Sequence, residues 1–177
     1  MPNAISMLRI LGTVALLFIK PLTALFFVIY TLCGLSDVLD GMIARRTGTT
    51  SPLGARMDSI ADLLYYAVMV LKIMPVLLGI LPLWLWCAAG VVVVLRLAAY
   101  IVAAMRYGKF ASLHTYMNKI TGAAMFTMPY VLMLPCAVAL CAVICAIAGL
   151  SSVEELLMHI LSKEYKEGVK SIFLINR

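Results

Sequence analysis

The stretch from Ser36 to Asp62, SDVLDGMIARRTGTTSPLGARMDSIAD, contains every aspartate of the chain. These residues are Asp37, Asp40, Asp58 and Asp62. Members of each pair are three or four positions apart, so they share one face if their segment is helical. Between the pairs, RTGTTSP is rich in turn formers and predicts a short loop. The two helices are then antiparallel neighbours, and we expect the four carboxylates to meet in one pocket.

The composition indicates an integral membrane protein. Of the 177 residues, 64% are hydrophobic and 12% are charged, whereas about a quarter of the residues of a soluble domain are charged. So short a chain cannot bury that much apolar surface by folding in water. The formal net charge of +6 suits phosphate groups or anionic lipid, and the positive-inside bias of membrane proteins explains it equally well.

Apolar runs separated by proline, glycine and polar clusters predict six helices, since a membrane helix needs about 20 residues. The expected ranges are 5–19, 22–45, 52–72, 83–106, 116–134 and 135–149, with Pro75 and Pro82 bracketing the connection before the fourth helix. The predicted fold class is an all-α polytopic bundle of about six transmembrane helices. Basic residues gather on one side, which predicts cytoplasmic termini and a cytoplasmic aspartate site. We expect the plasma membrane of a prokaryote as the location.

A separate C-terminal helix is expected after residue 150. Ser151 and Glu154 have the spacing of a capping box. The apolar stripe that follows is typical of an amphipathic helix on the membrane surface or against the bundle. It consists of Val153, Leu156, Leu157, Ile160 and Leu161. The predicted organisation is therefore a membrane domain over 1–150 and a cytoplasmic amphipathic tail over 151–177.

Clustered aspartates need cations between them. Each acid costs about 2.5–3.5 kcal/mol at the bilayer centre, and mutual repulsion adds to this cost. Hard oxygen ligands favour Mg²⁺, Mn²⁺ or Ca²⁺. Small residues at Gly41, Ala44 and Gly54 leave room for a bulky ligand, which with an arginine suggests a diphosphate site. The alternative is a set of interhelical ion pairs between the aspartates and the arginines of the stretch, Arg45, Arg46 and Arg56.

The order of these residues resembles the signature of the CDP-alcohol phosphotransferases. It reads Asp37-x2-Asp40-Gly41-x2-Ala44-Arg45-x8-Gly54-x3-Asp58-x3-Asp62. The resemblance extends from Met1 to about Leu150. It implies transfer of a phosphate-linked group from a CDP-alcohol to an acceptor hydroxyl with release of CMP. In the lipid-synthesising members the donor is CDP-diacylglycerol.

The resemblance also implies roles for the residues of the signature. Two divalent ions, Mg²⁺ or Mn²⁺, are expected on Asp37, Asp40, Asp58 and Asp62. Asp62 is the expected general base. The cytidine diphosphate site is expected to be formed by Asp37, Gly41, Ala44, Arg45, Gly54 and Asp58.

The acceptor is less closely specified. DSIAD (58–62) is similar to the DSLAD of serine-transferring members, and LRLAAY (95–100) to their fourth helix, although the Phe-Gly-Val-Ala-Pro run they often carry is missing. A basic set instead favours a phosphorylated acceptor; it comprises Arg96, Arg106, Lys109 and Lys119. We favour serine, with glycerol 3-phosphate next. We expect membrane lipid, but not nucleic acid, as a partner. The sequence leaves the formation of a homodimer undecided.

Two other classes also use aspartates in membranes. A membrane prenyltransferase binds a diphosphate through aspartate-bound Mg²⁺, but it usually needs two separated Asp-rich motifs and a larger bundle. A small cation transporter often shows internal repeats, and the chain has no second copy of the motif. Neither class releases CMP from CDP-diacylglycerol.

Overall fold

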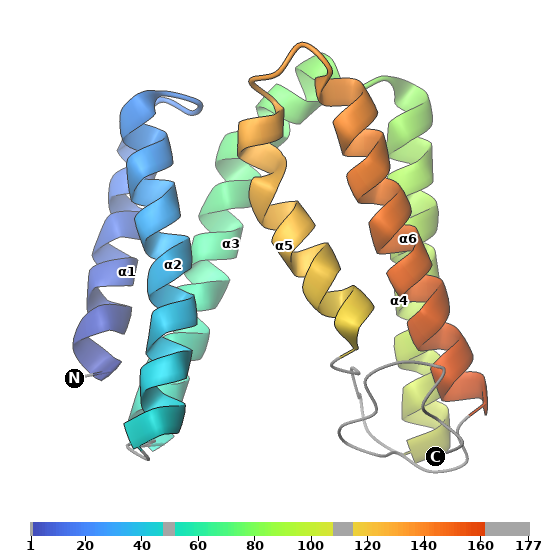
Figure 1. Ribbon diagram of the computed structural model, residues 1–177, viewed down its shortest axis with the longest axis horizontal. Coiled ribbons are helices and arrows are strands. Elements are labelled where there is room, and N and C mark those ends of the chain that lie inside the picture. Colours follow the sequence, from blue (N-terminus) through green and yellow to red (C-terminus); the bar gives the residue numbers. More distant parts are fainter. Residues whose placement is uncertain (1, 48–51, 108–114, 162–177) are drawn as a thin grey trace. The chain divides into compact units, whose positions relative to one another are not determined.

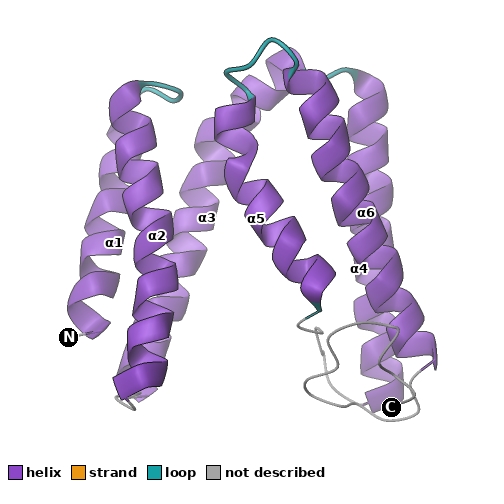
Figure 2. Cartoon of the chain, viewed as in Figure 1, coloured by secondary structure: helices purple, strands orange, loops and turns teal. Residues whose placement is uncertain are grey.

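The computed structural model describes the chain over residues 2–47, 52–107 and 115–161, and its side chains over 6–36, 58–107 and 115–161. This described part is all-helical, with six helices and no strand (Figure 2). It divides into two compact units, 1–80 and 81–177, each with three of the helices. The all-α fold class and the number of helices are confirmed.

The first unit is an up-down-up arrangement of α1 (Pro2–Phe18), α2 (Ala24–Thr47) and α3 (Pro52–Ile80) (Figure 1). The helix α1 packs against both α2 and α3. It approaches α2 closely at Gly12, where an added Cβ would lie 2.7 Å from Sγ of Cys33. Between α2 and α3, Tyr65 donates a hydrogen bond to the carbonyl oxygen of Tyr30 (3.1 Å), and the two rings stack with centroids 5.8 Å apart.

The second unit contains α4 (Leu83–Tyr107), α5 (Tyr116–Val131) and α6 (Ala137–Leu161). The helix α6 packs against both α4 and α5, running parallel to α4 and antiparallel to α5 (Figure 1). Thr115 caps the start of α5, because its hydroxyl accepts a hydrogen bond from the backbone N–H of Asn118 at 3.1 Å. Asn118 therefore lies in the first turn of α5, next to the cap.

Two predicted helix ends are wrong. The third helix does not end near residue 72, because α3 continues through Pro75 to Ile80. The expected break near Gly149 is absent too, since α6 is continuous from Ala137 to Leu161. Ser151 therefore lies inside a helix and caps none. The domain division at residue 150 stays a prediction, and residues 162–177 lie outside the described residues.

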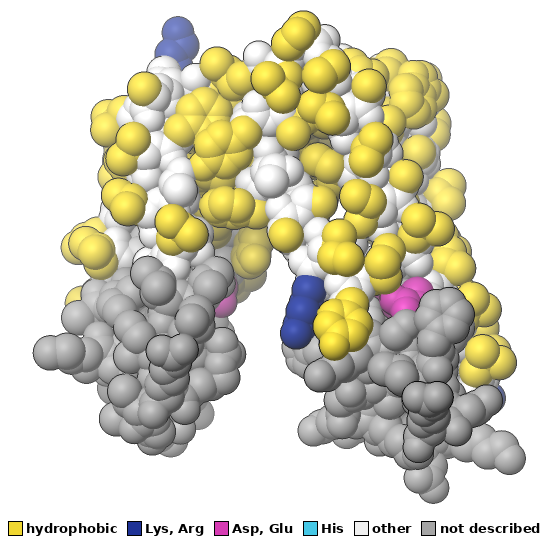
Figure 3. Space-filling view, in the orientation of Figure 1, with side chains coloured by type: hydrophobic (Ala, Val, Ile, Leu, Met, Phe, Trp, Pro, Cys, Tyr) yellow, Lys and Arg dark blue, Asp and Glu magenta, His cyan; other side chains and the backbone are white. Residues whose placement is uncertain are grey.

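The helix α1 and the last turns of α6 bury polar residues and expose apolar ones. In α1 the buried stripe is Ser6, Arg9, Thr13 and Leu16. The buried face of α6 after Leu150 is Ser151, Ser152, Glu155, Met158 and His159, while much of the predicted apolar stripe is exposed. Hydrophobic side chains also cover much of the described part of the face shown in Figure 3. This inverted pattern suits a protein surrounded by lipid, where the exterior is apolar.

Three of the described helical segments are long and apolar enough to cross a membrane. They are Asp58–Ile80, Leu83–Tyr107 and Ala137–Leu161. Two shorter apolar segments, Ser6–Phe18 and Ala24–Ser36, lie in α1 and α2. An integral membrane bundle follows from these lengths. The count of six crossings and the cytoplasmic orientation stay predictions.

Candidate active site

The aspartates lie on the backbone where the sequence predicted them. Asp37 and Asp40 are in the last turns of α2, and Asp58 and Asp62 are in the first turns of α3. Because the two helices are antiparallel, both pairs are at the same end of the first unit (Figure 1). Several site residues have side chains outside the described ones: Asp37, Asp40, Gly41, Ala44, Arg45 and Gly54.

Asp58 and Asp62 share one face of α3 and meet the same cation. That cation is Arg9 of α1, whose Nη2 lies 3.1 Å from Oδ1 of Asp58. Its Nη1 donates a hydrogen bond to Oδ1 of Asp62. The arginine side chain is 1% exposed, whereas the aspartates are 39% and 36% exposed. Arg9 is thus buried beneath the two aspartates, whose side chains stay partly exposed.

Sequence reasoning missed Arg9 as a site residue. It had been counted only among the basic residues of the cytoplasmic side, and the ion-pair alternative considered Arg45, Arg46 and Arg56. A usable signal was present, since Arg9 stands inside an apolar run and an ionisable residue within a membrane helix is a functional candidate by default. The structure supplies its partners.

The described acids fit the chemistry of a divalent-ion site. Oδ1 of Asp58 is buried and accepts no hydrogen bond, and its contact with Arg9 is an ion pair only. Carboxylate oxygens are the ligands that Mg²⁺ and Mn²⁺ prefer. The backbone brings Asp37 and Asp40 to the same end of the unit. The described residues contain no group of three acids, histidines or cysteines, so the four-carboxylate site stays a prediction.

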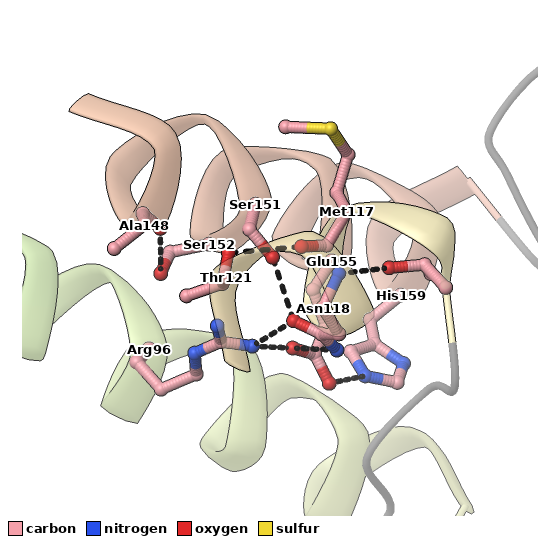
Figure 4. Close-up of polar contacts among 10 residues, drawn as sticks. Arg96, Met117, Asn118, Thr121, Ala148, Ser151, Ser152, Glu155 and His159 are labelled. Atoms are coloured by element: carbon pink, nitrogen blue, oxygen red, sulfur yellow. Dashed lines mark hydrogen bonds and ion pairs between the residues drawn. The ribbon is translucent and has the colours of Figure 1, made fainter. Parts of the chain in front are cut away.

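A second polar cluster joins the three helices of the other unit (Figure 4). Arg96 of α4 pairs with the fully buried Glu155 of α6 and donates to Oδ1 of Asn118 at 2.9 Å. The amide nitrogen of Asn118 donates to Glu155 (3.2 Å), and the Ser151 hydroxyl donates to Oδ1 of Asn118 (2.6 Å). His159 Nε2 lies 4.0 Å from Glu155.

The cluster changes the view of the predicted acceptor residues. Arg96 interacts with Glu155 and Asn118. Arg106 donates to the carbonyl oxygens of His159 (3.0 Å) and Ile160 (2.6 Å) near the end of α6. Its positive charge there suits the helix C-terminus. Lys119 is exposed on α5, and Lys109 lies outside the described residues. The structure does not bring Arg96 and Arg106 together as one open basic pocket.

Glu155, Asn118 and His159 are further residues that sequence reasoning passed over. Glu155 had been assigned to a surface tail. The available signal was the place of Arg96 in the middle of an apolar run: an arginine there needs a buried acceptor, and Glu155 and Asn118 are acceptors in the neighbouring helices.

A model of the CDP-alcohol phosphatidyltransferase family matches residues 1–154. The chain belongs to this family. The match includes the aspartate stretch, Arg9 and most of α6. Comparison with curated proteins and with solved structures found no significant match. The family assignment makes the chain a membrane transferase that acts on a CDP-alcohol and an acceptor alcohol, in agreement with the resemblance of its signature residues.

Proposed function

We propose that this family member transfers the phosphatidyl group of CDP-diacylglycerol to a small polar alcohol, with release of CMP. The observation that carries the proposal is the accessible Asp58–Asp62 pair at the start of an apolar helix, in a chain of this family. A lipid donor and a water-soluble acceptor can meet only at the membrane surface. An acidic site at one end of a lipid-facing helix suits that requirement.

In the proposed reaction, Asp62 accepts the proton of the acceptor hydroxyl as general base. The acceptor oxygen then forms a bond to the phosphorus that carries diacylglycerol, and the bond from that phosphorus to the bridging oxygen breaks. The bridging oxygen leaves with CMP. Mg²⁺ or Mn²⁺ held by Asp37, Asp40, Asp58 and Asp62 would supply charge neutralisation for the diphosphate. Gly41, Ala44, Arg45 and Gly54 line the cytidine diphosphate site in this proposal.

We favour serine as the acceptor, and the second polar cluster supports this choice. Glycerol 3-phosphate carries up to two negative charges and needs two or more cations. To bind it, Arg96 and Arg106 would have to exchange Glu155 and the α6 carbonyl groups for phosphate. Serine carries one carboxylate, so Arg96 alone could bind it, and only the Arg96–Glu155 contact would have to be exchanged. Under this choice Arg96 is the proposed serine-binding residue, and Arg106, Lys109 and Lys119 would complete the acceptor-binding set only for a phosphorylated acceptor.

The decisive experiment measures CMP release by the purified protein in detergent. CDP-diacylglycerol is supplied at saturation with serine or glycerol 3-phosphate alone, with and without a chelator. We expect turnover with serine that requires Mg²⁺ or Mn²⁺. Turnover with glycerol 3-phosphate but not serine would change the acceptor. Full turnover after exhaustive chelation would remove the metals, and no CMP release with any alcohol would contradict the proposed reaction.

A further inference from the structure

The helix α1 presents a polar stripe to the interior of the first unit. Ser6, Arg9 and Thr13 are each 2% exposed or less, and they are spaced three and four residues apart. The opposite face of α1 is apolar and exposed. In a membrane helix, a buried arginine is costly unless an acid pairs with it. The partners of Arg9 must therefore be part of what fixes α1 in place.

Those partners are two residues of the family signature. Asp58 and Asp62 are one helical turn apart on α3, where two like charges repel each other. One guanidinium reaches Oδ1 of both carboxylates. Its planar, rigid arrangement of N–H donors fixes the direction as well as the separation of the groups that it contacts. A flexible ammonium group offers no such constraint.

The difference in exposure separates Arg9 from the site surface. Arg9 is 1% exposed and lies behind carboxylates that keep more than a third of their surface. Its backbone is held as well, because Cys33 Sγ on α2 lies 3.9 Å from the Arg9 carbonyl oxygen. An arginine so placed acts on a ligand through the aspartates that it contacts. Partners of this kind orient metal ligands in other proteins, and their loss typically lowers metal affinity about 10- to 100-fold.

We propose that Arg9 is a positioning residue of the aspartate site. By contacting Asp58 and Asp62 together, it fixes the geometry in which their carboxylates receive a divalent ion. This inference rests on the proposed function in one respect, namely that these aspartates hold an ion. It does not depend on the identity of the donor or the acceptor.

The test uses the full-length protein in detergent, stripped of divalent ions, and measures its melting temperature against Mn²⁺ concentration. We expect Mn²⁺ to stabilise the wild type. Arg9→Lys keeps the charge but loses the planar donors, so the Mn²⁺ concentration at half-maximal stabilisation should rise about tenfold or more. The matched control is Lys72→Gln, because Lys72 of α3 also contacts α1, donating to the Leu17 carbonyl oxygen (2.8 Å). It should lower the melting temperature without moving the Mn²⁺ midpoint.

Each other outcome is decisive. An Arg9→Lys midpoint equal to the wild-type value would reduce Arg9 to a packing residue, and a lower midpoint would make it a competitor of the ion; either overturns the proposal. If Arg9→Lys does not fold, Arg9→Gln takes its place, and failure of both to fold also overturns it. The proposal is also overturned if Mn²⁺ does not stabilise the wild-type protein. A shifted midpoint in a protein that releases no CMP would leave Arg9's role standing and refute the proposed reaction alone.

Discussion

Asp58 combines a charge that is costly to a membrane protein with a position that is open to ligands. Its side chain is 39% exposed and its backbone is in the first turns of α3. Asp58 and Asp62 both pair with the buried Arg9, and each keeps more than a third of its side chain exposed. In the proposed function, the exposed carboxylates also hold a divalent ion. Because one carboxylate still pairs with Arg9 when the other is removed, mutation of either residue should affect the reaction more than the fold.

Asp58→Asn should abolish turnover and still yield protein that elutes as one species in detergent. A metal ligand contributes several kcal/mol to the transition state, so CMP release should fall by roughly a hundredfold or more. Glu154→Gln is the control, since it removes an acid outside the cluster and should leave the rate near that of the wild type. Near-normal turnover by Asp58→Asn would show that Asp58 is not a ligand.

Arg96→Lys should distinguish the two candidate acceptors by its effect on the KM for serine. In the proposed function, the change would remove a two-point contact with the serine carboxylate, and it weakens the contacts with Glu155 and Asn118. A hydrogen bond to a charged group contributes about 1.5–3 kcal/mol, so the KM for serine should rise about tenfold or more. Lys119→Gln should change it little. Equal effects of the two variants, with glycerol 3-phosphate as the substrate that turns over, would refute the serine assignment.

The signature residues could be placed from the sequence because a fixed spacing carries that information. Their partners could not, since Arg9 and Asp58 are 49 positions apart and no local pattern joins them. The same holds for Arg96 and Glu155. In both cases an arginine inside an apolar run indicated that a partner exists. Only the packing of the helices identifies which acid it is.

Among the helices, the contact of α1 with α2 depends on a glycine. A Cβ on Gly12 would lie 2.7 Å from Sγ of the buried Cys33, closer than real contacts allow. Gly12→Ala should therefore destabilise the protein, although alanine alone favours a helix by up to about 1 kcal/mol. Cys33→Ala removes the sulfur, and the double variant should recover most of the loss. Melting temperatures of the three variants in detergent test this, and no recovery in the double variant would contradict it.

The ion pair between Arg96 of α4 and Glu155 of α6 should also contribute to stability. Glu155→Ala leaves Arg96 without its carboxylate, and breaking a buried ion pair costs about 3–5 kcal/mol. We expect the lower end of this range, because Arg96 is 23% exposed. Unfolding in detergent against denaturant measures the loss. Glu154→Ala, at a half-buried neighbour, should lower the free energy of unfolding less. Equal losses in the two variants would contradict a stabilising role of the Arg96–Glu155 pair.

The sequence predicted helix ends correctly where a proline begins a helix. It failed where a proline or glycine lies inside a continuous helix. Pro52 begins α3, as expected from the preference of proline for the first turn. Pro75 was taken as an end, yet α3 continues through it. Apolar helices tolerate an internal proline because neighbouring groups satisfy the freed backbone. Gly149 was also taken as a helix end, but α6 continues through it. Only Val92 lies near the position of its missing Cβ.

For the chain as a whole, orientation in the membrane is the testable consequence of its charge distribution. In a background without the five native cysteines, Thr49→Cys should react with an impermeant thiol reagent only from the cytoplasmic side. Lys20→Cys, expected at the opposite surface, is the control and should react only from outside. Labelling of Thr49→Cys from outside would place CMP release on the wrong side for the proposed reaction.

The uninterrupted course of α6 bears on how this enzyme can be recombined with its relatives. The family match stops at residue 154, one position before Glu155, the acid that neutralises Arg96. A chimera joined at that boundary would inherit the arginine from one parent and the residue at 155 from the other. The natural crossover point therefore lies beyond Leu161, where α6 ends. The family match ends inside α6, before the Arg96–Glu155 pair is complete, so it does not mark the end of a structural unit.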